Sequence, residues 1–226
     1  MNKLIILLLL ILFSCQEKKQ KSIIETTKKV DTIYQGIPAD STTYPGHEAF
    51  NWTWESPKEK IILSDFFLKY IAKGKEPYDT FIGDLNLDKY LDLVLVSRDI
   101  DEDSLKYLNG DLTRELLVFL GAENNKYKFL FKNSTAIPCV NCCGMSDPFN
   151  GIEIGKGQLK INQFCGSSYK SVSESRFNYK AKFQNWQLDT VITESYYYNY
   201  LNYSLDTATK KTFGNKLLKT FVMYDD

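Results

Sequence analysis

The sequence lacks the short motifs that mark the common hydrolases and nucleotide-binding enzymes. No Gly-x-Ser-x-Gly elbow, phosphate-binding loop or HExxH zinc motif occurs in it. The chain has a single histidine, His47, in an irregular Pro- and Gly-containing stretch ahead of the main run of strands. A lone histidine of this kind is far more often structural or exposed than catalytic. The sequence therefore favours binding over catalysis.

An excess of one charge and a long apolar run are also missing. The 28 basic residues balance 28 acidic ones, which leaves no electrostatic basis for binding nucleic acid. The apolar run at residues 4–13 is far shorter than the roughly 20 residues that a transmembrane helix needs.

That apolar run belongs to an N-terminal leader that ends in a cysteine. Lys3 gives it a positive start, and Ser14 and Cys15 close it, which is the layout of a secretory signal. Its Leu-x-Ser-Cys end resembles the bacterial lipobox, in which the cysteine is diacylated and becomes the mature N-terminus. We predict a signal peptide at residues 1–14 and lipidation at Cys15. The alternative is an ordinary secretory signal with an incidental cysteine.

The leader also predicts where the protein resides and how the rest of the chain is organised. We expect a lipid anchor in the bacterial cell envelope, and Gln16 in place of Asp after the cysteine favours the outer membrane. Residues 15–33 are predicted to be the acylated cysteine and a flexible tether, because their polar side chains cannot bury enough surface to fold. Residues 34–226 are predicted to form a single β-rich domain.

The pattern within that domain predicts an all-β fold. One short helix is expected near its N-terminal side, at residues 64–71, with Gly74 as its terminator. Short strands joined by tight turns follow, which favours an antiparallel meander of propeller-like architecture, with a β-sandwich as the alternative. The expected hairpins pair residues 115–120 with 127–131, 152–154 with 159–161, and 177–183 with 186–192. A buried strand at 91–96 and weaker strands at 196–203 and 219–223 complete the prediction.

An acidic loop precedes the buried strand and is the strongest chemical motif. Asp84, Asn86, Asp88 and Asp92 occupy loop positions 1, 3, 5 and 9, and Tyr90 would offer its backbone carbonyl at position 7. Calcium prefers six to eight oxygen ligands, which alternate residues of a curled loop can supply. The loop is not an EF-hand, since a leucine replaces the glutamate required at position 12. The alternative is a turn in which these side chains cap backbone donors.

The loop resembles the Gly-Asp-x-Asn-x-Asp-Gly-x-x-Asp-Leu loop of FG-GAP and VCBS-type propeller repeats. The resemblance implies that Asp84, Asn86, Asp88 and Asp92 are calcium ligands. Leu87 and Lys89 stand where that pattern prefers glycine, and a left-handed conformation costs a non-glycine residue roughly 1–2 kcal/mol.

A second acidic group follows the buried strand. It comprises Asp99, Asp101, Glu102 and Asp103. We interpret it as a solvated loop; the alternative is that it supplies outer ligands to the ion.

Four cysteines remain once Cys15 is acylated, and they are predicted to form structural disulfides. An oxidising envelope compartment favours this interpretation over a metal site or free redox thiols. Cys142 and Cys143 are adjacent and are not expected to bond each other. This leaves Cys139–Cys142 with Cys143–Cys165, which we favour, or Cys139–Cys143 with Cys142–Cys165.

A second resemblance covers residues 81–198. The acidic loop, the Cys-x-x-Cys segment and an Asp-Pro-Phe-x-Gly-Ile motif at residues 147–152 together resemble a family of small bacterial envelope lipoproteins with one VCBS-like loop. Most members have no assigned activity, and some are related to propeller-like immunity lipoproteins that inhibit cell-wall hydrolases. Members tend to show glycine where Cys143 and Cys165 stand, which is consistent with an additional disulfide here.

These observations lead to two hypotheses about function. The first is a membrane-anchored, non-enzymatic lipoprotein that binds a protein or ligand in the envelope and inhibits a peptidoglycan hydrolase. The aromatic stretches at residues 51–54 and 196–198 are its candidate interface anchors. The alternative is an envelope hydrolase that acts on glycans or peptides, for which Asp147 and Glu153 are candidate carboxylates.

Overall fold

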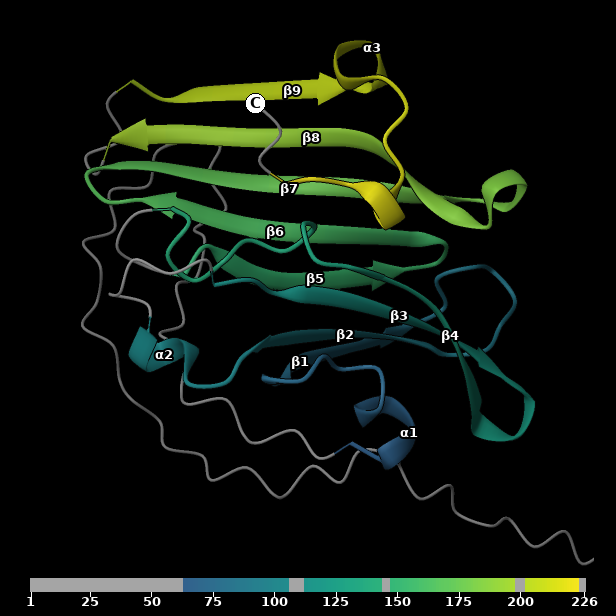
Figure 1. Ribbon diagram of the computed structural model, residues 1–226. Helices are drawn as coiled ribbons and strands as arrows, with labels where there is room; N and C mark the ends of the chain where they lie inside the picture. Colours follow the sequence, from purple (N-terminus) through teal and green to yellow (C-terminus); the bar gives the residue numbers. More distant parts are fainter. Residues whose placement is uncertain (1–62, 106–111, 144–146, 198–201, 224–226) are drawn as a thin grey trace, which may run out of the picture. The chain divides into compact units, whose positions relative to one another are not determined.

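The computed structural model describes residues 63–105, 112–143, 147–197 and 202–223 (Figure 1). The chain divides into two units, 1–64 and 65–226, and every described helix and strand belongs to the second. The predicted leader, Cys15, the tether, His47 and residues 51–54 lie outside the described residues. Within the described part, no helix is both long enough and apolar enough to cross a bilayer.

The second unit consists of two antiparallel sheets, each a meander in which sequential strands pair (Figure 1). The first sheet contains β1 (Lys75–Gly83), β2 (Asp92–Asp99), β3 (Glu115–Ala122) and β4 (Lys126–Asn133). The second contains β5 (Phe149–Gly155), β6 (Gln158–Gly166), β7 (Tyr169–Lys180), β8 (Asn185–Tyr197) and β9 (Ser204–Thr209). The prediction of an all-β, antiparallel meander is confirmed.

The three predicted hairpins are also present. β3 and β4 pair across the 3-10 turn η1 (Glu123–Asn125), β5 and β6 across Lys156 and Gly157, and β7 and β8 across η2 (Ala181–Phe183). Asn124 and Gln184 turn the chain with φ of 60° and 46°. Asn tolerates this left-handed conformation because its short side chain can hydrogen-bond locally.

The helical and terminal predictions needed correction. The predicted helix at 64–71 is present as α1 (Asp65–Leu68), and single turns bonded from i to i+3 carry the chain on to Ile71. Two further four-residue helices, α2 (Glu102–Leu105) and α3 (Lys210–Phe213), were not predicted. The strand predicted at 219–223 is wrong, because the 3-10 helix η3 (Leu218–Thr220) occupies its start.

One hydrophobic core contains side chains from both sheets. β2 and β3 contribute Val94, Val96, Leu116 and Val118, and the second sheet contributes Leu159, Ile161, Phe177 and Leu188. This shared core is the arrangement expected of the β-sandwich alternative, since two sheets bury their inner faces against each other.

The other face of the first sheet is covered by aromatic side chains of α1 and the chain after it. The Phe67 ring lies edge-on to Phe119 at 5.1 Å, and Tyr70 stacks on Phe129 at 4.3 Å between ring centroids. Because both faces of β2 are covered, all six residues from Asp92 to Ser97 are buried. This explains why the strand is continuously apolar rather than alternating.

Candidate functional site

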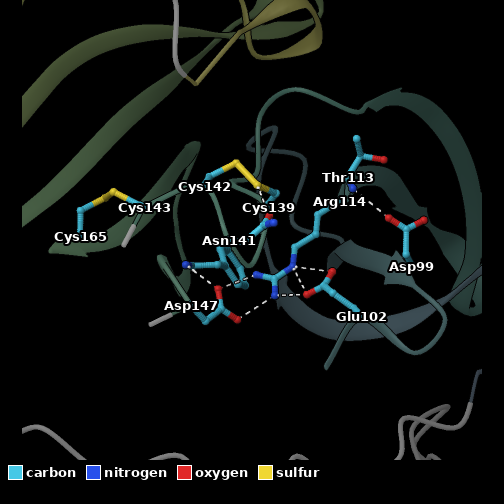
Figure 2. Close-up of a disulfide and its surroundings, with 11 residues drawn as sticks. Asp99, Glu102, Thr113, Arg114, Cys139, Asn141, Cys142, Cys143, Asp147 and Cys165 are labelled. Atoms are coloured by element: carbon cyan, nitrogen blue, oxygen red, sulfur yellow. Dashed lines mark hydrogen bonds and ion pairs between the residues drawn. A yellow bond between two sulfur atoms is a disulfide. The ribbon is translucent and has the colours of Figure 1, made fainter. Parts of the chain in front are cut away.

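A largely buried ionic cluster joins Arg114 to the carboxylates of Glu102 and Asp147. The Arg114 Nε donates to Glu102 Oε1 at 2.9 Å, and its Nη1 and Nη2 donate to the two oxygens of Asp147 at 2.8 and 2.7 Å. Nη2 also donates to Glu102. The Arg114 side chain is 1% exposed and that of Glu102 is fully buried. Figure 2 shows the guanidinium held between the two carboxylates.

Tyr78 and Phe149 complete the surroundings of Arg114. The guanidinium lies 4.5 Å from the centroid of the Tyr78 ring, and the Tyr78 hydroxyl donates to Asp147 Oδ2 at 3.0 Å. The Phe149 N–H donates to Asp147 Oδ1 at 2.9 Å. Each oxygen of Asp147 therefore accepts two hydrogen bonds, which uses its ordinary acceptor capacity.

The cluster overturns part of the interpretation of the second acidic group. Glu102, predicted to lie in a solvated loop, starts α2 and is buried against Arg114. Burial raises the pKa of Glu102, and the hydrogen bonds from Arg114 oppose that rise. Asp99 accepts hydrogen bonds from Lys75 and from the Thr113 N–H, both at 2.8 Å. Asp101 and Asp103 are exposed, as predicted.

Two disulfides involve the three cysteines of the segment 139–143, which precedes Asp147. Cys139 bonds Cys142 and Cys143 bonds Cys165 (Figure 2), which is the favoured of the two predicted pairings. The first closes a short loop, and the second ties the segment to β6. The second link ties the chain close to Asp147 to the second sheet, which supports the position of Asp147 beside Arg114.

The two carboxylates proposed for glycan hydrolysis are held in different ways. Asp147 belongs to the Arg114 cluster, whereas the Glu153 side chain is 59% exposed and accepts hydrogen bonds from Lys160 at 3.2 Å and Asn162 at 3.0 Å. The hydrogen bond from Asn162 is the main cause of a lowered pKa of Glu153. A general acid in a glycosidase needs a raised pKa, so Glu153 does not suit that role.

The acidic loop is closed by its own side chains. Asp84 accepts hydrogen bonds from the N–H groups of Leu87 at 2.7 Å and Lys89 at 3.3 Å. Asn86 accepts from the Asp88 N–H, and Asp88 accepts from the Tyr90 N–H at 2.9 Å. Leu87 and Lys89 both adopt left-handed φ, at 69° and 75°. Leu87 and Lys89 therefore adopt the left-handed conformation at the two positions where the propeller-repeat loop prefers glycine.

Asp92 anchors the loop from inside the protein. Its two oxygens accept the N–H groups of Leu85 and Gly121, each at 2.8 Å. The side chain is inaccessible to solvent, and this burial raises the pKa of Asp92 to about 6, with the charges of Asp88 and Asp84 adding to the rise. Gly121 is required here because a Cβ atom would lie 2.2 Å from the Leu91 carbonyl oxygen.

The calcium prediction has mixed support from this geometry. The side-chain oxygens of Asp84, Asn86 and Asp88 belong to one partly exposed loop, but these side chains, like Asp92, already accept backbone N–H groups. Among the described residues, no three His, Cys, Asp or Glu side chains gather as a metal-binding group. The capped turn accounts for the loop conformation by itself, and calcium binding by Asp84, Asn86, Asp88, Tyr90 and Asp92 stays a prediction.

Removing Arg114 should destabilise the fold strongly. Arg114→Met leaves the buried Glu102 carboxylate without its partner, and we expect a loss of about 3–5 kcal/mol in the free energy of unfolding. Lys160→Met, which breaks more exposed ion pairs with Glu153 and Glu174, should cost below about 1 kcal/mol. Urea denaturation measures both.

The double variant Arg114→Met/Glu102→Met tests the reason for that loss. Replacing both buried charges by apolar side chains should recover at least half of the stability lost in Arg114→Met. Equal stability of the single and double variants would contradict the electrostatic explanation.

The raised pKa of Asp92 predicts how stability depends on pH. The folded protein holds this proton up to about pH 6, whereas an unfolded Asp releases it near pH 3.9. Stability should therefore fall as the pH rises from about 4 to 6, with a contribution of about 2–3 kcal/mol from this group. Urea midpoints measured across this range should fall less steeply for Asp92→Asn than for the wild type. Equal slopes would show that Asp92 does not titrate here.

Thermal melting tests calcium at the acidic loop. If the ion binds, calcium at ten times its dissociation constant should stabilise the protein by about 1.4 kcal/mol relative to the same sample in EDTA. Lys89→Gly removes a positive charge and a left-handed non-glycine residue, and it should enlarge the calcium-dependent shift. Asp88→Ala is the matched loss-of-ligand control. An unchanged melting temperature for both wild type and Lys89→Gly would exclude the site.

Comparisons with protein families, curated proteins and solved structures found no match to this chain. No protein-family model matches the chain. No curated protein matches it, and no solved structure does so. The function therefore has to be argued from the described side chains.

Proposed function

We propose that this protein is a lipid-anchored component of the bacterial envelope that acts by binding, and that it inhibits a peptidoglycan hydrolase. The two disulfides support an oxidising compartment, where such bonds persist. This agrees with the lipobox-like end of the leader at Cys15. Attachment to the outer membrane is part of the same proposal.

One observation supports binding over catalysis more than any other. The buried carboxylates of the described domain all have structural partners: Glu102 bonds Arg114, Asp92 accepts two backbone N–H groups, and Glu115 pairs with Lys132. The half-buried Asp147 also bonds Arg114. A general acid or base must exchange its proton with a substrate within hydrogen-bond reach. Carboxylates whose oxygens are already occupied in this way are suited to holding the fold.

The tip of the acidic loop is the surface that we propose for partner binding. Leu87 and Leu91 are 61% and 58% exposed, and Tyr90, which precedes Leu91 in the chain, is 38% exposed and donates a hydrogen bond to Glu123. Exposed apolar side chains gathered on one rigid loop are typical of binding sites. The left-handed conformations of Leu87 and Lys89 add support, because strained backbone is concentrated at functional sites.

The aromatic stretch at residues 196–198 is less suited to this role. Tyr196 is buried and Tyr197 is 42% exposed, while residue 198 lies outside the described part. Of the two described tyrosines, only Tyr197 is exposed enough to contact a partner.

Peptidoglycan zymography tests the proposed function. The full-length protein in detergent should suppress clearing by an added lysozyme-type hydrolase and should produce no clearing alone. Leu91→Ser should weaken the suppression at least tenfold without unfolding the domain, since the side chain is exposed. Phe183→Ser, which changes a comparably exposed apolar side chain on η2, should leave it unchanged.

Two outcomes would overturn the proposal. Intrinsic clearing of peptidoglycan would favour the alternative, an envelope hydrolase acting on glycans or peptides. Absence of suppression across hydrolases that cleave the glycan strand and those that cleave the peptide would remove the inhibitory role.

A further inference from the structure

One face of the second sheet carries hydroxyl and amide side chains beyond the point where the apolar core ends. Gln163 on β6 pairs with Ser173 on β7, Ser173 pairs with Thr193 on β8, and Thr193 pairs with Asp206 on β9. Residues that pair directly across antiparallel strands project to the same face. This row therefore continues the face that carries Ile161 and Leu159 of the core.

The next row along the strands has the same character. Ser171 pairs with Ser195, and Ser195 pairs with Ser204. The hydroxyls bond each other weakly: Ser173 Oγ lies 3.2 Å from Thr193 Oγ1, and Ser195 Oγ lies 3.4 Å from Ser171 Oγ. We name Gln163, Ser171, Ser173, Thr193, Ser195 and Asp206 the hydroxyl face.

Gln163 is the exceptional member of the hydroxyl face. It is 6% exposed, and its Nε2 is the one buried side-chain nitrogen or oxygen without a hydrogen-bond partner among the described residues. An unsatisfied buried amide costs about 1–3 kcal/mol. A buried donor left without a partner in a sheet that is otherwise well bonded needs an explanation, and a bound molecule supplies one.

Two tyrosines border the hydroxyl face one row further on. Tyr169 on β7 pairs with Tyr197 on β8, and their rings meet edge to face at 5.3 Å. They are 48% and 42% exposed. Rings of this kind offer an apolar surface and a polar hydroxyl at the edge of a polar site.

We propose that the hydroxyl face and this tyrosine pair bind a neutral oligosaccharide. The hydroxyl groups of Ser173 and Thr193 both donate and accept, as the hydroxyls of a sugar do. In the proposed complex the Gln163 side chain turns so that its buried Nε2 donates to a sugar oxygen, and the Tyr197 ring packs against the C–H face of the sugar. From β6 to β9 the row extends about 14 Å, taking about 4.8 Å per strand spacing, which suits several linked sugars.

The charge of this surface selects the ligand class. The rows that run from Gln163, from Ser171 and from Tyr169 contain no Lys or Arg among their described residues, and Asp206 is their only charge. A phosphate or other anion would meet no cation there. A peptide is less suited than a glycan, since main-chain recognition uses the edge of a sheet rather than its face. This binding goes beyond the proposed inhibition and does not depend on it.

Isothermal titration of the full-length protein in detergent tests the proposal. The probes are N,N′,N″-triacetylchitotriose and cellotriose, with tetra-alanine as the peptide probe. We expect a saturable signal for at least one trisaccharide and none for tetra-alanine. Tyr197→Ala should weaken trisaccharide binding at least tenfold, whereas Phe183→Ala, an exposed aromatic outside the face, should leave it unchanged.

Gln163→Met separates a binding role from a structural one. Replacing the unpartnered amide by an apolar side chain of similar size should leave the melting temperature equal or higher, while trisaccharide binding falls at least tenfold. No binding of either trisaccharide by the wild type would overturn the proposal. Equal binding by the wild type, Tyr197→Ala and Gln163→Met would do the same, as would a signal from tetra-alanine alone.

Discussion

The burial of one carboxylate, Asp92, is the constraint on which the arrangement of the two sheets depends. Asp92 fixes the N–H of Leu85, and the Leu85 carbonyl accepts the indole N–H of Trp186 from β8 at 2.8 Å. The neighbouring Asp84 carbonyl accepts the Gly157 N–H from the turn between β5 and β6 at 2.9 Å. Loop and sheets are thus bonded together through backbone groups, and Asp92 supports these bonds by holding the Leu85 N–H from inside the protein.

Arg114 provides a second link that depends on charge. Its partners come from α2 and from the segment just before β5, so one guanidinium joins three parts of the chain that are distant in sequence. A buried ion pair adds little net stability over an apolar replacement, but it specifies geometry because a misplaced partner leaves a buried charge unpaired. The disulfide between Cys143 and Cys165 reduces that risk, since it restricts the chain that carries Asp147.

The sequence allowed the hairpins to be predicted because their signals are local. Alternation on β5 to β8 and turn residues between the strands lie within a few positions of each other. β1 was missed because Pro77 and the bulge beside it interrupt its pattern, and β9 because Ser, Asp and Thr dominate it. The Arg114 cluster could not be predicted, since its carboxylates are 12 and 33 residues away in sequence. The one available signal was an arginine directly before a strand that is apolar after its first residue, Glu115.

The acidic loop and Gln163 both depart from what stability alone would select, and they differ in kind. At the acidic loop, the strain of Leu87 and Lys89 is offset within the loop, because Asp84 bonds the N–H of each strained residue. At Gln163 no such compensation exists among the described residues. Local strain that is compensated by the fold can persist as a structural feature, whereas an uncompensated buried donor needs another reason. Gln163 is therefore the stronger indication of an external ligand, although the acidic loop has the more familiar sequence pattern.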